Sequence, residues 1–167
     1  LLVELQALTV PAKGSISRVF SDRIDSGRVS RIAAVLEKHV GLRFSDQDIY
    51  VNVAGGIRLS EVGIELPLAM ALYSARTDIP LPSKTVLAGE VSLTGEVRPI
   101  SHMKRRVKSS ADMGFPTFIG PGEGDEVGSQ AAVCGMLPGP PFSLPGQADS
   151  RLVPELVVPA LGLLQVA

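Results

Sequence analysis

The stretch "DSGRVSRIAAVLEKHVGLRFSDQDIYVNVAGGIR" (25–58) contains the pattern that decides the fold class. Its first half predicts a helix, which Asp25 or Ser26 is expected to cap and Gly41 to end. Apolar residues recur on one face of this helix at helical spacing: Val29, Ile32, Ala33, Leu36 and Val40. The second half, "DIYVNVAGG" (48–56), predicts a strand that runs into a glycine loop.

The flanking segments continue this alternation of helices and strands. Upstream, residues 1–10 and 15–20 predict two strands joined by a turn, and therefore an N-terminal hairpin. Four elements are expected downstream: a helix that begins near 64–67, paired strands within 84–100, a helix at 103–114 and a strand at 117–120. The whole predicts an α/β or α+β fold with a mixed sheet.

The composition fits one domain with an aliphatic core. Of the 167 residues, 45% are hydrophobic and only 4% are aromatic, with no Trp. No apolar run reaches the roughly 18 residues that a membrane span requires, and a single cysteine, Cys134, cannot form an internal disulfide. These features favour a cytoplasmic protein without a membrane partner. Because the first residue is Leu1 rather than Met, we expect a fragment of a longer protein.

The character of the chain changes after residue 120. Residues 1–120 are expected to form the core and carry fifteen basic and twelve acidic residues, whereas 121–167 carry one Arg and five acids. Residues 121–150 are rich in Pro and Gly and predict an irregular, mobile segment. Residues 151–167 form an apolar tail that is expected to pack back on the core.

Several common kinds of site are not expected. His39, His102 and Cys134 lack the spacing of metal ligands, so no metal site is predicted. The segment "GPGEGDEVG" resembles a phosphate loop only superficially, because its acids would repel phosphate. Without a Walker A sequence, no ATP hydrolysis is expected in this chain.

Two groups of basic residues are candidates for binding anions. The first group lies within eleven residues and contains no acid: Arg98, Lys104, Arg105, Arg106 and Lys108. A nucleic-acid contact and an ordinary solvated helix face both remain open for it. The second, looser group comprises Arg18, Arg23, Arg28 and Arg31. Because Asp22 and Asp25 alternate with two of these arginines, local ion pairing is the favoured interpretation.

Three stretches carry a resemblance to a known family: "VELQALTVP" (3–11), "DSGRVSRIAAVLEKHVGLRFSDQDIYVNVAGGIRLSE" (25–61) and "LPLAMALYSARTDIPLPSKTVLAGEVSLTGEVRPI" (66–100). In this order and spacing they closely resemble the C-terminal domain of the RadA (Sms) family of bacterial DNA repair proteins. That domain is similar to the proteolytic domain of Lon proteases. The match covers about residues 2–120 and implies a Lon-protease-like α/β fold, related to the second domain of ribosomal protein S5.

The resemblance also implies that this domain is not catalytic. Lon proteases use a Ser-Lys dyad, and the matching positions here are Gly63 and Arg106. Glycine has no nucleophile, and arginine cannot become the neutral base that such a dyad needs. We expect Arg106 to pair with a carboxylate or phosphate within the former cleft. A displaced dyad of Ser60 with Lys104, and hence a Lon-like ATP-dependent serine peptidase, is the alternative.

The family resemblance implies a context for the domain. It suggests a scaffold that assembles into a ring, expected to be a homohexamer, and that faces single-stranded or branched DNA during processing of recombination intermediates. ATP and zinc are expected only in upstream RecA-like and zinc-finger modules, so this domain should carry no cofactor. A RecA-type recombinase is a candidate partner. An RNA-binding role by analogy with ribosomal protein S5 is a weaker alternative, because it rests on fold alone.

Overall fold

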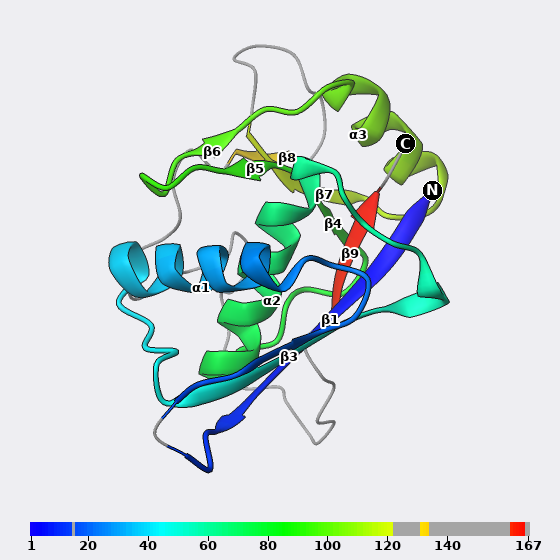
Figure 1. Ribbon diagram of the computed structural model, residues 1–167. Coiled ribbons are helices and arrows are strands. Elements are labelled where there is room, and N and C mark those ends of the chain that lie inside the picture. Colours follow the sequence, from blue (N-terminus) through cyan, green and yellow to red (C-terminus); the bar gives the residue numbers. More distant parts are fainter. Residues whose placement is uncertain (15, 122–130, 134–160, 166–167) are drawn as a thin grey trace, which may run out of the picture.

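The computed structural model describes residues 1–14, 16–121, 131–133 and 161–165, and shows a mixed α/β fold (Figure 1). The first half of the chain forms β1 (Leu2–Pro11), β2 (Val19–Ser21), α1 (Ser26–Val40), β3 (Gln47–Val53), the short 3-10 helices η1 (Ala54–Gly56) and η2 (Val62–Ile64), and α2 (Glu65–Thr77). The second half forms β4 (Thr85–Leu87), β5 (Glu90–Val91), β6 (Val97–Arg98), α3 (Met103–Asp112), β7 (Thr117–Gly120), β8 (Ala131–Val133) and β9 (Leu161–Gln165).

The strands form one large sheet and one small hairpin. Within the described residues, the large sheet has seven strands in the order β2-β3-β1-β9-β4-β7-β8, and β5 pairs with β6 in a separate sheet. Strand β1 is antiparallel to both β3 and β9, whereas the pairs β2–β3, β4–β9, β4–β7 and β7–β8 are parallel. The expected mixed sheet and α/β class are therefore confirmed.

The predicted N-terminal hairpin is wrong. Strand β2 does not return along β1 but lies parallel to β3, with Phe20 opposite Tyr50. Asp48 explains this pairing, because its carboxylate accepts hydrogen bonds from both the backbone N–H and the guanidinium of Arg18. The backbone N–H of Ile49 also donates to the carbonyl of Arg18. The segment before β2 is thus held by β3, and β1 pairs with the other edge of β3.

Two helices cover one face of the sheet. Helix α2 packs on β1 and α1 packs on α2, so the apolar face of α1 is buried as its spacing predicts (Figure 1). Asp25 caps α1 through the backbone N–H of Arg28, and Gly41 ends the helix with φ of 77°. In α2, Pro67 lies in the first turn, where its missing N–H leaves no helical hydrogen bond unmade.

Two short pieces of the C-terminal part lie within the described residues. Ala131–Val133 forms strand β8, so the segment predicted to be irregular contains three residues of regular structure. The apolar tail contributes Leu161–Gln165, which pairs with β1 on one side and β4 on the other. The remainder of both predictions lies outside the described residues. Strands β8 and β9 are both part of the large sheet.

Candidate functional site

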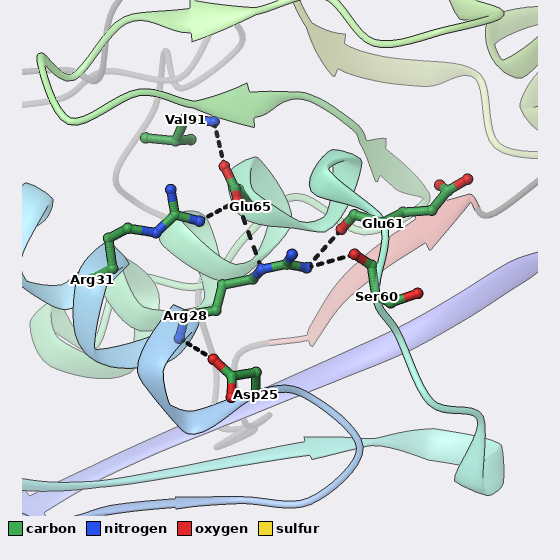
Figure 2. Close-up of polar contacts among 7 residues, drawn as sticks. All are labelled: Asp25, Arg28, Arg31, Ser60, Glu61, Glu65 and Val91. Carbon is green, nitrogen blue, oxygen red and sulfur yellow. Dashed lines mark hydrogen bonds and ion pairs between the residues drawn. The ribbon is translucent and has the colours of Figure 1, made fainter.

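A cluster of charged residues joins the start of α1, the segment before α2 and the hairpin β5–β6. Figure 2 shows that the side chains of Arg28 and Arg31 extend from α1 toward Glu65 at the start of α2. The cluster lies where the family resemblance places the former dyad, since Gly63 stands between Glu61 and Glu65. We therefore treat this charged cluster as the candidate site.

Glu65 is the buried acid of the cluster. Its side chain is only 1% exposed, and it forms ion pairs with Arg31 and, at 3.7 Å, with Arg28. Its Oε2 accepts the backbone N–H of Val91 at 3.0 Å (Figure 2). A carboxylate at the first residue of a helix also interacts favourably with the helix dipole. The burial of this charge is thus offset by hydrogen bonds from Arg31 and the Val91 N–H and by a longer ion pair with Arg28.

Arg28 connects α1 to the segment that precedes α2. Besides its ion pair with Glu65, its Nη1 donates to the backbone carbonyl oxygens of Ser60 at 3.0 Å and Glu61 at 2.9 Å. Two further hydrogen bonds hold this segment, since Leu59 N–H donates to the carbonyl of Arg23 and Gly89 N–H donates to the carbonyl of Gly63. The backbone around residues 59–63 is therefore fixed from several directions.

Arg106 is buried and paired with a carboxylate, as expected. Its side chain is 2% exposed, and its Nη2 lies 3.2 Å from Oε2 of Glu61. Its Nε donates to the backbone carbonyl of Ser101 at 3.0 Å, which fixes the turn before α3. Because Arg106 is enclosed and engaged, it is not positioned to reach a phosphate in solution. The suggestion that Arg106 contacts DNA does not fit this burial.

Gly63 is packed against a side chain from the other side of the hairpin. A Cβ atom at this position would lie 2.5 Å from Cδ1 of Ile100, so the flexible end of the Ile100 side chain would have to shift to admit it. Gly63 is buried, and its carbonyl accepts the Gly89 N–H at 3.1 Å. The position that matches the protease serine is therefore filled by Ile100.

The rest of the first basic group lies on the surface. Arg98, Lys104, Arg105 and Lys108 are all exposed. Arg98 forms an ion pair with Glu96 at 2.9 Å, next to it in the hairpin, so part of its charge is compensated. The three exposed cations of α3 remain a candidate phosphate-binding surface, which we call the α3 cations.

The second basic group is paired, but mostly with distant acids. The predicted local pairing is confirmed for Arg23, which lies 3.2 Å from Asp22. Arg18 instead pairs with Asp48 at 2.8 Å. The hydrogen bond from Arg18 is the main cause that lowers the pKa of Asp48 below its ordinary value, and it raises the pKa of Arg18. Arg28 and Arg31 share Glu65, a partner that spacing along the chain did not suggest.

The sequence contained one signal for Glu65 that our reasoning missed. It is the single acid in the otherwise uncharged run "GIELPLAMALYSA", and an acid in such a run must find a partner when the helix is buried. Within the described residues, no three His, Cys, Asp or Glu side chains are grouped as a metal would require. In the same part of the chain, no helix is both long and apolar enough to cross a membrane.

The fold and the charged cluster together define an α/β domain with a charge-paired centre. A family model described as subunit ChlI of Mg-chelatase matches residues 22–124, more than half of the chain. The chain belongs to this family.

Similar full-length proteins carry a different description. The chain is 62% identical over 120 residues to the DNA repair protein RadA of Treponema pallidum, which covers 72% of this chain and 26% of that protein. It is 45% identical over 114 residues to RadA of Brucella abortus, and 44% identical over 121 residues to RadA of Bacillus subtilis. These alignments cover 68% and 72% of this chain, and 24% and 26% of those proteins. The chain thus spans about a quarter of the length of the relatives that it matches.

Proposed function

We propose that this chain is the Lon-protease-like domain of a RadA-type DNA repair protein, and that it acts as a non-catalytic scaffold facing DNA. Identity of 62% over 120 residues to a protein named DNA repair protein RadA supports the repair role. The family description names a subunit of Mg-chelatase. The RadA relatives carry more weight for this proposal, because 62% identity over 120 residues is a more specific likeness than a broad family description, although it spans only 26% of that protein.

The observation that carries the non-catalytic assignment is the state of the two dyad positions. Position 63 has no nucleophile and is packed against Ile100. Arg106 is buried, charged and paired with Glu61. An arginine keeps its proton at any physiological pH, so it cannot activate a serine. Neither position therefore carries a group that a Ser-Lys dyad could use, which supports the proposed non-catalytic role.

The DNA-facing part of the proposal rests on the α3 cations, Lys104, Arg105 and Lys108. Phosphate contacts of this kind position a protein on DNA without reading its sequence. In a ring, which we propose to be a homohexamer, each subunit would add its own set, so a small cluster would be repeated several times. ATP and zinc would act in upstream modules, and single-stranded or branched DNA and a RecA-type recombinase would be the partners, in the cytoplasm.

The test is DNA binding measured over a range of salt concentrations. The triple variant Lys104→Gln, Arg105→Gln and Lys108→Gln should bind single-stranded DNA more weakly. The slope of log K against log salt should fall by about 2, since each lost contact removes roughly 0.7 from the slope. Lys38→Gln is the matched control, an exposed lysine on α1. An unchanged affinity and slope in the triple variant would remove the DNA-facing part.

The peptidase alternative has its own test. Ser60 is exposed and its carbonyl accepts from Arg28, while Lys104 lies on the surface of α3. No geometric feature of the described residues favours a dyad between them. Casein turnover that disappears in Ser60→Ala or Lys104→Ala would nevertheless establish this function and overturn the scaffold proposal.

A further inference from the structure

The face of the sheet that α1 and α2 leave uncovered carries two stacked aromatic rings. Phe20 on β2 and Tyr50 on β3 are register partners, with ring centroids 4.7 Å apart and ring planes within 10° of parallel. Their side chains remain 42% and 38% exposed. Only seven aromatic residues occur in the whole sequence, so the exposure of two adjacent ones is a costly use of apolar surface.

Polar groups surround this pair in a particular arrangement. The guanidinium of Arg18 lies 5.4 Å from the centre of the Phe20 ring, a cation–π distance, while its other side is held by Asp48. The side-chain amide of Asn52, on β3 like Tyr50, donates a hydrogen bond of 3.2 Å to the side-chain amide oxygen of Gln6 on β1. Rings, amides and the exposed Leu8 line an open groove of about 780 Å³. We call this surface the aromatic face.

We propose that the aromatic face binds single-stranded nucleic acid by stacking a base on the Tyr50 ring, which Phe20 supports from its other side. A base has two flat apolar sides and a hydrogen-bonding edge, and the face offers stacked rings beside exposed amide donors and acceptors. Arg18 is paired with Asp48, so its half-exposed guanidinium adds a flat hydrogen-bond donor beside the rings rather than an uncompensated charge. Stacking is tolerant of sequence, which suits a domain without specific readout.

The composition of the face argues for a base rather than a second protein copy. The core of a protein interface is depleted of charged groups and rich in closely packed apolar side chains. Here an ion pair and an amide pair flank the rings, and Leu8 is the exposed aliphatic residue among those that line the groove. A ring platform with one adjacent cation is typical of proteins that hold unpaired bases.

This inference deepens the proposed DNA-facing function, but it depends on different residues. The α3 cations would contact phosphates, which every strand has, whereas the aromatic face would contact bases. An oligonucleotide of thymidines and an abasic oligonucleotide of equal length separate the two contributions. They present the same charge, and only the first has rings to stack.

Tyrosine fluorescence gives a direct readout of contact. The chain has two tyrosines and no Trp, and Tyr73 is buried in α2. In the variant Tyr73→Phe, the remaining signal comes from Tyr50. Addition of the thymidine oligonucleotide should quench this signal, whereas the abasic oligonucleotide should leave it nearly unchanged.

The variants test stacking as distinct from apolar area. Tyr50→Ala and Phe20→Ala should weaken binding of the thymidine oligonucleotide by roughly 5- to 150-fold, the range for loss of one stacked base. Tyr50→Phe should bind as the unaltered chain does. Tyr50→Leu retains an apolar side chain without a ring, and should also bind weakly. Circular dichroism and a thermal melt identify variants that fail to fold. If the Tyr50 variants fail to fold, quenching of Tyr50 fluorescence in Tyr73→Phe still tests whether the base contacts this ring.

The outcomes separate this inference from the proposed function. Equal binding of both oligonucleotides, without quenching, overturns the aromatic face and leaves the α3 cations as the DNA contact. Wild-type affinity in Tyr50→Leu also overturns it. Failure to bind either oligonucleotide removes the DNA-facing function as well. Self-association seen by light scattering and lost in Phe20→Ala would show that a second copy occupies the face, which overturns the inference.

Discussion

Replacement of Glu65 by alanine should destabilise the fold more than any surface substitution. Glu65 is the buried end of an ion-pair cluster, and its removal leaves Arg28 and Arg31 without their shared partner. It also leaves the backbone N–H of Val91 without its acceptor. Helix α1, helix α2 and the hairpin β5–β6 would therefore lose their common polar connection at once.

The magnitude follows from how well the remaining charges can regain water. Removal of one partner from a buried ion pair costs about 3–5 kcal/mol. The side chains of Arg28 and Arg31 are 19% and 39% exposed, so both can recover part of their hydration. We therefore expect a loss of about 3 kcal/mol in the free energy of unfolding, at the low end of that range. For a domain with roughly 5–15 kcal/mol of total stability, this is a large fraction.

Urea denaturation followed by circular dichroism measures this loss. The free energy of unfolding of Glu65→Gln should lie between those of Glu65→Ala and the unaltered chain. The amide oxygen can still accept from the Val91 N–H, while the charge is lost. Glu96→Ala is the control, because it removes an exposed carboxylate paired with Arg98 and should cost less than about 1 kcal/mol. If Glu65→Ala lost no more stability than Glu96→Ala, the claim that this cluster holds the elements together would be refuted.

Three further predictions follow from the site and from strand β2. Gly63→Ser should destabilise the fold by about 1 kcal/mol, at the low end for overpacking because only the mobile end of Ile100 must shift, and its effect should be smaller when measured in an Ile100→Ala background in the same urea assay. Arg106→Lys should also destabilise, by about 1–3 kcal/mol, because one ammonium cannot reproduce the guanidinium bonds to Ser101 and Glu61; a neutral result would argue against a structural role. The Asp48 pKa is lowered, so its pairing stabilises the fold above the ordinary pKa of about 4, and that stability is lost as pH falls through the lowered value. Urea midpoints should therefore fall less between about pH 5 and about pH 2 in Asp48→Asn than in the unaltered chain, and equal slopes would contradict the pairing.

Elements with a strong local pattern could be predicted from the sequence. The helix at Ser26–Val40 has a clear apolar face, a capping aspartate and a terminal glycine, so its type and both ends were correct. The pairing of β2 was not predictable in this way. A turn between two strands suggested a hairpin, but the bond between Arg18 and Asp48, thirty residues apart, places β2 beside β3. Local spacing contains no information about such a contact.

The site shows the same contrast between what a local pattern predicts and what contacts distant along the chain decide. The expectation that Arg106 pairs with a carboxylate came from its matching position in the family, and the pairing is observed. Its partner Glu61 lies forty-five residues earlier, and nothing in the spacing identified it. Glu65 could have been recognised as an acid in an apolar run, but its partners on α1 depend on how two helices pack. Sequence reasoning thus identified residues that need a partner, and the fold supplied which partner.

Glu61 connects the two parts of the site that the proposed function treats separately. Its carbonyl oxygen is held by Arg28 of α1, and its carboxylate by Arg106 of α3. The exposed cations of α3 therefore stand on a helix whose inner side is attached to the charged cluster. A change at Arg106 can then lower DNA affinity without any contact between Arg106 and DNA. The salt dependence separates the two cases: loss of a phosphate contact reduces the slope of log K against log salt by roughly 0.7 for a single strand, whereas a displaced helix with its cations intact lowers affinity at an unchanged slope. Because Arg106 is 2% exposed, we expect the second result.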